Sequence, residues 1–389
     1  MPLQELLLAD TPAALDAALT RLAGEEVVGV DVERADWDRY FRAPALIQIG
    51  AGGTVALADP LAISDLSPLR DFLSSRTVVL HAMENDIGPM AAVGVTLRAV
   101  EDTAIAAAML GLPTGLEALL SAVLGVELAG DKQAMQRAAW EARPLSQEML
   151  AYAAGDVADL PELWDVLAQQ LDETGRAAWY RQEMEAMLAQ PPAEQRRAWT
   201  RVRGGGRLDP LARARLRALW EARESLARST DSAPARIAGD KVLVDLAARP
   251  PESTSELGRR GMRRRAIQSF GQALIAAIRS AEAPDPEAAV RSGRAPTGAD
   301  RDREQQLRAL RTARAEALGI DPGVLCPSRT LMSALLSDPA TPEELRDALG
   351  LRPWQWEQLS KLFSEALGLG EAGNLSAEEP ANNEERTYG

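Results

Sequence analysis

Two carboxylates end a short apolar stretch near the start of this chain. Residues 27–33 read Val-Val-Gly-Val-Asp-Val-Glu, a composition typical of a buried strand. Because strand side chains alternate between two faces, Asp31 and Glu33 lie on one face, where like charges repel unless water or a cation neutralises them. Mg²⁺ prefers such oxygen ligands together with substrate phosphate. Taken alone, the pair fits either a solvated strand end or part of a metal site.

Three further residues favour the metal site. Asp86 follows the apolar stretch 77–81, while Tyr152 and Asp156 are four residues apart on an expected helix, which places them on one helical face. Four carboxylates gathered from strand ends and a facing helix can hold two metal ions about 3.5–4 Å apart. Such a pair polarises a phosphodiester and lowers the pKa of a bound water, which Tyr152 would orient or help to deprotonate.

The elements around these residues predict an α/β fold. Residues 46–49 and 55–57 flank Gly50-Ala51-Gly52-Gly53 and predict a hairpin, and a further strand is expected over residues 77–81. Strands come first and helices follow, with crossovers between them, so we expect a mixed sheet covered by helices. The expected helices span residues 11–22, 66–73, 84–93, 102–110, 115–124 and 144–171.

Composition narrows the class of protein. A chain of 389 residues accommodates two or three domains, and its 46% hydrophobic content is ample for their cores. No apolar run approaches the ~20 residues of a membrane helix, and no basic region precedes the N-terminal leucines as in a secretory signal. The single cysteine, Cys326, excludes an intrachain disulfide and a multi-cysteine zinc site. We therefore expect a cytoplasmic protein with no membrane partner and no obligate protein partner.

The formal net charge of −14 is unevenly distributed along the chain. Residues 1–190 carry 12 Arg and Lys against 29 Asp and Glu, residues 194–281 carry 19 against 9, and residues 282–389 carry 12 against 19. A basic block between acidic flanks indicates a polyanionic partner, with solvated helix faces as the alternative. Only three of the basic residues are lysines, and the guanidinium group is the better suited to bidentate phosphate contacts.

A change of composition after residue 188 predicts a division into domains. Residues 208–281 and 300–370 are helical in pattern, and these two segments parallel each other helix by helix. A repeat of about 80–90 residues is too long for a solenoid unit, so we interpret the segments as a duplicated small helical domain. The expected parts are the α/β domain (1–190), a basic connector (191–207), a first helical domain (208–282), a linker (283–299), a second helical domain (300–370) and a disordered tail (371–389).

Arginines cluster just before the last helix of the first helical domain. Glycine lets a backbone approach phosphate closely, and helix N-termini favour anions, so this cluster predicts a nucleic-acid contact. The alternative is a solvated face paired with the acidic domains. The arginines are Arg259, Arg260, Arg263, Arg264 and Arg265, beside Gly258 and Gly261.

The order of the acids and the tyrosine resembles the four-acid-plus-tyrosine subclass of 3′→5′ exonucleases, and in particular the ribonuclease D family. The resemblance rests on Asp31-x-Glu33, Asp86 and Tyr152-x-x-x-Asp156, and on the surrounding Leu46-Ile47-Gln48-Ile49, His81-Ala82, Asp131-Lys132 and Trp140-x-x-Arg143-Pro144-Leu145. The two helical domains are similar to the HRDC domain, a nucleic-acid-binding domain that the family shares with certain helicases. Together these likenesses cover about residues 10–370.

The resemblance implies a ribonuclease-H-like fold and removal of nucleoside 5′-monophosphates from RNA 3′ ends with Mg²⁺ or Mn²⁺. It implies that Asp31 bridges two ions, that Glu33 and Asp156 complete one site, that Asp86 holds the other ion, and that Tyr152 positions the attacking water. RNA with a free 3′ end, such as a tRNA precursor, is then the expected substrate. A DNA exonuclease and a non-catalytic nucleic-acid-binding module are the alternatives.

The sequence also departs from the family pattern beside the first acids. The family motif usually reads Asp-Thr-Glu followed by an aromatic residue, whereas this chain has Val32 and Arg34 at those places. Val32 is expected to point away from the metals, and Arg34 to alter the wall of the pocket for the terminal nucleotide. Base stacking or core packing is open to Trp37, Tyr40 and Phe41. The single histidine, His81, is expected to be a packed or hydrogen-bonded residue and not a general base.

Overall fold

The computed structural model describes residues 3–34, 39–41, 43–128, 132–135, 137–190, 198–281 and 296–369. The chain divides into two compact units, residues 1–292 and 293–389. The predicted tail (371–389) and most of the predicted linker (283–299) lie outside the described residues. No helix among the described residues is long and apolar enough to cross a membrane.

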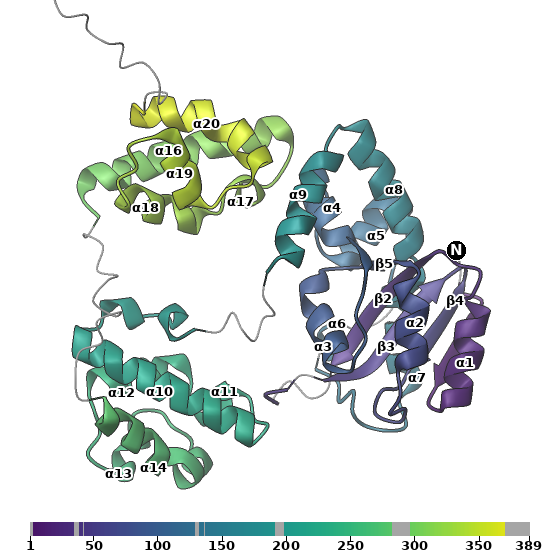
Figure 1. Ribbon diagram of the computed structural model, residues 1–389, viewed down its shortest axis with the longest axis horizontal. Coiled ribbons are helices and arrows are strands. Elements are labelled where there is room, and N and C mark those ends of the chain that lie inside the picture. The colour runs from purple at the N-terminus through teal and green to yellow at the C-terminus, as the bar shows by residue number, and fades with distance from the viewer. Residues whose placement is uncertain are drawn as a thin grey trace, which may run out of the picture. The chain divides into compact units, whose positions relative to one another are not determined.

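A mixed sheet of six strands, as the sequence predicts, lies among the helices that precede residue 190 (Figure 1). Its order is β1-β4-β3-β2-β5-β6. β3 is antiparallel to both of its neighbours, β2 and β4, and all other neighbouring strands are parallel. The expected hairpin is β3 and β4, joined by Gly52 and Gly53, whose positive φ angles suit a tight hairpin turn. The strands are β1 (Glu5–Ala9), β2 (Val27–Arg34), β3 (Pro44–Ala51), β4 (Thr54–Ala58), β5 (Thr77–Leu80) and β6 (Ala99–Asp102).

Helices cover this sheet, and two of them differ from the expected pattern. The single helix expected over residues 144–171 is divided at Asp159, where Pro161 lies in the first turn of the second helix and cannot continue the hydrogen-bond ladder. The helix expected over residues 84–93 begins as a 3₁₀ turn, η1 (Met83–Asn85). The helices are α1 (Pro12–Arg21), α2 (Ser67–Ser74), α3 (Ile87–Ala92), α4 (Thr103–Leu110), α5 (Leu116–Leu124), α6 (Lys132–Met135), α7 (Gln147–Ala158), α8 (Leu160–Glu173) and α9 (Ala177–Leu188).

Two glycines let α7 approach the sheet closely. Gly29 on β2 and Gly50 on β3 are paired across the strands. A Cβ atom at Gly29 would lie 2.6 Å from the carbonyl oxygen of Val157, and one at Gly50 would lie 2.7 Å from the same oxygen. Any larger residue would therefore push α7 away from β2. This close packing brings the residues of α7 down to the carboxylates of β2.

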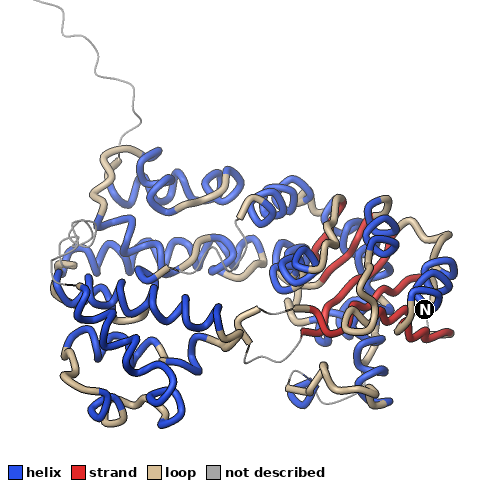
Figure 2. The backbone as a smooth tube through the Cα atoms, turned by 60° about the horizontal axis from the view of Figure 1, so that its bottom comes forward, coloured by secondary structure: helices blue, strands red, loops and turns tan. Residues whose placement is uncertain are grey.

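The rest of the first unit is helical (Figure 2). The 3₁₀ turns η2 (Trp199–Arg201) and η3 (Gly205–Arg207) precede its helices, and Trp199 packs against their apolar core. Tyr40, from the segment after β2, is also buried in this core, with its ring 5.6 Å from the Arg228 guanidinium carbon. The helices are α10 (Pro210–Ser229), α11 (Pro234–Ile237), α12 (Asp240–Ala248), α13 (Thr254–Leu257) and α14 (Arg264–Ser280).

The second unit repeats the same succession of five helices. One buried arginine in each copy shows how closely the two correspond. Arg223 on α10 donates to the main chain 15 residues later and to a side chain 17 residues later, and Arg311 on α16 does the same. The helices of the second unit are α16 (Gly298–Leu318), α17 (Pro322–Leu325), α18 (Ser328–Leu336), α19 (Pro342–Leu349) and α20 (Pro353–Leu367).

Candidate active site

Three of the predicted carboxylates lie close together where α7 packs against β2. Asp31 and Glu33 lie on the face of β2 that carries Gly29, and Asp156 lies on α7. One carboxylate oxygen from each of the three lies within 4.8 Å of the others. Such a cluster of oxygen ligands suits a hard divalent cation such as Mg²⁺ or Mn²⁺.

The electrostatics of these acids also fit a bound cation. Burial raises the pKa of Asp31 from 3.8 to about 6, although the backbone N–H of Val32 and the charge of Arg34 oppose the shift. The pKa of Glu33 is raised from 4.5 to about 9, chiefly by burial and then by the charges of Asp31 and Asp156. Without a cation, Asp31 and Glu33 therefore resist ionisation. A divalent cation would favour the ionised form of all three.

Asp86 joins the site from the end of β5. It lies between η1 and α3 and is only 4% exposed. Burial raises its pKa to about 9, followed in importance by the charge of Asp31, and Arg34 opposes the shift. The carboxylate is outside the group of three but close enough to feel their charge. This position is compatible with a second, more loosely held ion.

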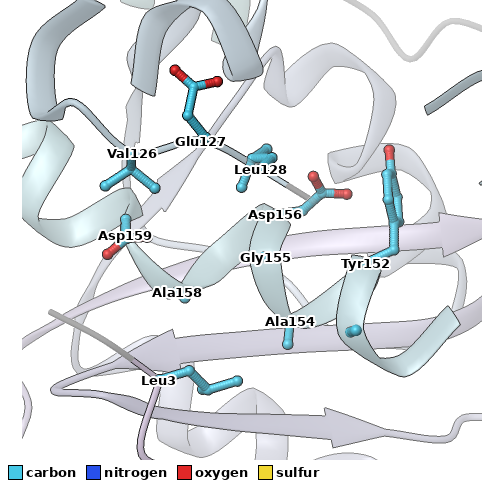
Figure 3. Close-up of a pocket in the computed structure, with 11 residues that line it drawn as sticks. Leu3, Val126, Glu127, Leu128, Tyr152, Ala154, Gly155, Asp156, Ala158 and Asp159 are labelled. Carbon is cyan, nitrogen blue, oxygen red and sulfur yellow. The ribbon is translucent and has the colours of Figure 1, made fainter. Parts of the chain in front are cut away.

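Tyr152 stands beside Asp156 on α7 (Figure 3), as the spacing of four residues predicts. Its hydroxyl hydrogen-bonds to the Asp156 carboxylate, and the ring centroid of Trp140 lies 6.3 Å from that of Tyr152. Burial, and then the neighbouring acids, raise the pKa of Tyr152 above its ordinary value. The phenol therefore keeps its proton at neutral pH, which suits a group that orients water.

Arg143 holds the segment before α7 to the sheet. It donates to the Asp59 carboxylate (2.6 Å), to the carbonyl of Trp140 (2.7 Å) and to the carbonyl of Ala45 on β3 (2.8 Å). Burial opposes ionisation of Asp59, but its hydrogen bond with Arg143 and two backbone N–H groups keep its pKa below the ordinary value. This clamp explains why Trp140-x-x-Arg143 accompanies the site. The sequence indicated the stretch but not its partner, which is 84 residues away.

Two features near the acids were not predicted. Gln48 is paired with Asp31 across β2 and β3, and its fully buried amide has no hydrogen-bond partner among the described residues. A pocket of about 500 Å³ also adjoins Asp156 (Figure 3). Its walls come from segments far apart in the sequence, so no local pattern indicates it. They include Leu3, Val126, Glu127, Leu128, Tyr152, Gly155 and Asp159.

The residues that depart from the family pattern have distinct surroundings. Val32 is buried on the opposite face of β2, as expected. Arg34 places a positive charge near the acids, because it lowers the pKa of Asp31, Glu33 and Asp86.

The aromatic residues that follow β2 differ in burial, and the histidine is hydrogen-bonded. Tyr40 is packed in a helical core and is 3% exposed, whereas Phe41 is 47% exposed. Trp37 lies outside the described residues. The ring of His81 hydrogen-bonds to Thr103, which confirms that it is a hydrogen-bonded residue.

The predicted arginine cluster lies at the start of α14. Arg260 is half-buried and pairs with Asp245 at 3.1 Å, so this member of the cluster also has a structural contact. The other four are exposed, and their side chains form no hydrogen bond or ion pair within the described parts of the chain: Arg259, Arg263, Arg264 and Arg265.

Comparisons with known proteins agree with this geometry. Residues 8–172 match the family described as 3′-5′ exonuclease, and residues 212–278 and 300–367 each match the HRDC domain. The fold and the acidic site thus define a 3′→5′ exonuclease followed by two HRDC domains.

Similar proteins specify the family. Ribonuclease D of Zymomonas mobilis is 35% identical over 288 residues, covering 71% of this chain and 72% of the relative. Ribonuclease D of Pseudomonas paraeruginosa is 30% identical over 350 residues, covering 87% and 92%. The crystal structure of Escherichia coli RNase D, described as an exoribonuclease involved in structured RNA processing, matches with a TM-score of 0.76 and 25% identity, covering 95% of this chain and 99% of that chain. The chain belongs to the ribonuclease D family.

Proposed function

We propose that this exonuclease shortens structured RNAs, tRNA precursors among them, from their 3′ ends and releases nucleoside 5′-monophosphates. The observation that carries the proposal is the meeting of Asp31, Glu33 and Asp156 at one point, with pKa values raised for the first two. A structural cluster of acids would be expected to acquire a basic partner. Among the described residues, the charge of Arg34 opposes but does not prevent the rise in the pKa of Asp31 and Glu33, and the three acids converge beside a tyrosine and a pocket.

Each residue has a separate role in this proposal. Asp31, Glu33 and Asp156 would hold one divalent cation, Mg²⁺ or Mn²⁺, and Asp86, together with Asp31, would hold a second. Bound cations of this kind polarise the phosphodiester, lower the pKa of the attacking water and stabilise the leaving oxygen. The Tyr152 hydroxyl, fixed by Asp156 and by the ring of Trp140, orients the water in line with the scissile P–O bond.

The reaction is hydrolysis of the last phosphodiester. The water oxygen forms a bond to phosphorus, and the bond between phosphorus and the 3′ oxygen of the penultimate ribose breaks. That oxygen takes up a proton, so the shortened RNA again ends in a 3′ hydroxyl. The remaining product is a nucleoside 5′-monophosphate.

The first helical domain supplies contacts to the rest of the RNA in this proposal. Residues 259–265 present four exposed arginines at the start of α14, and guanidinium groups bind phosphate in a bidentate manner. Phosphate contacts of this kind do not depend on base sequence. The cluster is therefore suited to hold many different RNAs while their 3′ ends are shortened.

A pair of end-labelled RNAs tests the proposal. With Mg²⁺, the protein should release labelled mononucleotide at once from 3′-labelled RNA, and should produce a ladder of shortened products from 5′-labelled RNA. Asp31→Asn should abolish both while RNA binding persists. A matched DNA strand separates the RNA enzyme from the alternative DNA exonuclease, since a site that contacts the 2′-hydroxyl distinguishes them. Equal turnover of DNA, or activity that survives Asp31→Asn, would contradict the proposal.

A further inference from the structure

We infer that Asp102 is a positioning residue for Asp86, because its carboxylate holds the main-chain turn on which Asp86 depends. The inference rests on the proposed role of Asp86 in binding a cation. Asp102 ends β6, next to the end of β5, and is only 1% exposed.

The carboxylate of Asp102 accepts four main-chain hydrogen bonds from two different elements. Oδ1 accepts from Ala104 (2.8 Å) and Ile105 (3.2 Å), in the first turn of α4. Oδ1 also accepts from Ala82 (3.2 Å), and Oδ2 accepts from Met83 (2.8 Å), in the turn that follows β5. Asp102 therefore joins the start of α4 to the segment that leads into Asp86.

The first pair of bonds is an ordinary helix cap, but the second pair is not. A serine would satisfy the N-terminal N–H groups of α4 equally well. Only a side chain with two acceptor oxygens can also reach the separate turn at Ala82 and Met83. The choice of aspartate over serine is thus explained by the contact with the turn.

The turn at Ala82 and Met83 needs this contact because one of its residues has an unfavourable backbone conformation. Ala82 adopts the left-handed conformation (φ 60°, ψ 54°), which non-glycine residues seldom occupy without support. The N–H of Asp86 bonds to the carbonyl of Met83 at 3.1 Å. A shift of Ala82 or Met83 would consequently move Asp86 through a single turn of 3₁₀ helix.

Asp102 is itself held from the other side by α9. Its backbone N–H donates to the hydroxyl of Tyr180 (2.9 Å), which donates in turn to Glu101 (2.7 Å). Glu101 forms an ion pair with Arg181 at 2.8 Å. Tyr180 and Asp102 are both almost fully buried, so the contact between α9 and the end of β6 is shielded from water. The position of Asp86 therefore depends on a helix that carries none of the acids.

The test compares Asp102→Ser with the unmodified full chain. Serine keeps the cap of α4 but is too short to hold the turn, so hydrogen exchange of a peptide covering residues 82–86 should accelerate. In Mn²⁺ titrations one of two ions should bind at least ~10-fold more weakly, the usual effect of losing a residue that orients a ligand, while the other ion is unaffected. With RNA, kcat should fall and KM should stay unchanged.

Two further variants make the test specific. Asp209→Ser changes a capping aspartate of the first helical domain, which accepts from Ala212 at the start of α10, and should leave all three measurements unchanged. Tyr180→Phe removes the support from α9 without touching the carboxylate, and should give a weaker effect in the same direction. It also serves if Asp102→Ser does not fold.

The outcomes separate this inference from the proposed function. Unchanged protection of residues 82–86 in both Asp102→Ser and Tyr180→Phe would overturn the inference. Faster exchange there with unchanged binding of both Mn²⁺ ions would support the positioning of Asp86 by Asp102, and would show that the proposed metal role of Asp86 is wrong.

Discussion

The two helical domains share a buried framework and differ at their surfaces. In the first, Arg223 donates to the carbonyl of Ala238 (3.1 Å) and to Asp240 (2.7 Å). In the second, Arg311 donates to the carbonyl of Cys326 (2.8 Å) and to the hydroxyl of Ser328 (2.7 Å). The same guanidinium therefore ties the long first helix to the following two helices in each copy. This buried positive charge belongs to the fold and not to RNA binding.

The N-terminus of the last helix shows the opposite behaviour. In the second domain, Gln355 is buried, accepts from the N–H of Arg352 (2.9 Å) and donates to the carbonyl of Val324 (2.8 Å). In the first domain, Ala266 stands at the corresponding place of α14, after three exposed arginines. One copy closes this end with its own side chain, whereas the other leaves it open and basic. These exposed arginines, together with the excess of basic residues over residues 194–281, support the proposal that the first copy is the one that contacts RNA.

The largest effect is expected from removing the buried arginines. Arg223→Leu removes the guanidinium that forms ion pairs with Asp240 and Glu224, and should lower the free energy of unfolding of its domain by about 3 kcal/mol. Arg311→Leu leaves two neutral acceptors, and should cost about 2 kcal/mol. Hydrogen exchange of peptides from each domain measures both. An equal loss in the two domains would show that the partners' charge is unimportant.

A smaller effect is expected from the exposed arginines of the first domain. If each of Arg263, Arg264 and Arg265 contacts one phosphate, changing all three to serine should reduce the salt dependence of single-stranded RNA binding by ~2 log units per log unit of salt. Turnover of short oligonucleotides should be unchanged. The matched control changes three exposed arginines of the second domain, Arg301, Arg303 and Arg329. A reduction of the same size in the control would remove the distinction between the two domains.

The sequence predicts the site better than it predicts the supports of the site. Asp31 and Glu33 follow a fixed spacing on one strand, and Tyr152 and Asp156 follow one on a helix, so each pair could be expected to share a face. The family resemblance, and not the spacing, indicated that the two pairs meet. Contacts between distant segments carry no such signal. The bond between Arg143 and Asp59 is an example, because nothing in either stretch specifies the other.

The sequence pattern also failed to indicate where one helix ends and the next begins, and which residues are buried by distant elements. The apolar periodicity continues through Asp159, although two helices meet there. Tyr40 is a second case. Its aromatic ring fits either a base or a core by composition, and only the assembled helices show that it is buried. The close approach of α7 likewise depends on Gly29 and Gly50 together, which are 21 positions apart.

Buried charges in the catalytic domain differ from the buried arginines because their partner is a removable ion. For Glu33 the pKa is about 9 in the folded protein against an ordinary 4.5, so the folded state binds more protons than the unfolded state between these values. Stability of the metal-free protein should therefore be greatest near pH 4–5 and should fall as the pH rises toward 9. Asp86 contributes in the same direction.

Thermal unfolding at pH 6 and pH 9 measures this dependence. With a chelator, the Tm should be lower by several degrees at pH 9, and saturating Mg²⁺ should remove most of the difference, since a ligand that binds the folded state stabilises it. Glu33→Gln should weaken the pH dependence. A metal-free Tm that rises toward pH 9 would show that these acids are already neutralised within the protein.

The smallest effect is expected one residue away from Glu33. Val32 faces away from the acids and pairs with Ile47 in the core, so Val32→Thr should change kcat by less than about two-fold, or about 0.4 kcal/mol. A buried hydroxyl there should cost about 1 kcal/mol of stability. Steady-state kinetics and thermal unfolding separate the two quantities. A large loss of kcat without a loss of stability would place residue 32 in the site after all.

Anomalous diffraction from a crystal of the protein soaked with Mn²⁺ tests most directly whether these carboxylates bind two metal ions. We expect one peak bounded by Asp31, Glu33 and Asp156, and a second about 3.5–4 Å away between Asp31 and Asp86. Asp31→Asn, which removes the shared ligand, should lose both. Peaks that lie elsewhere, or no peak among these carboxylates, would contradict the assignment of this cluster as the catalytic centre.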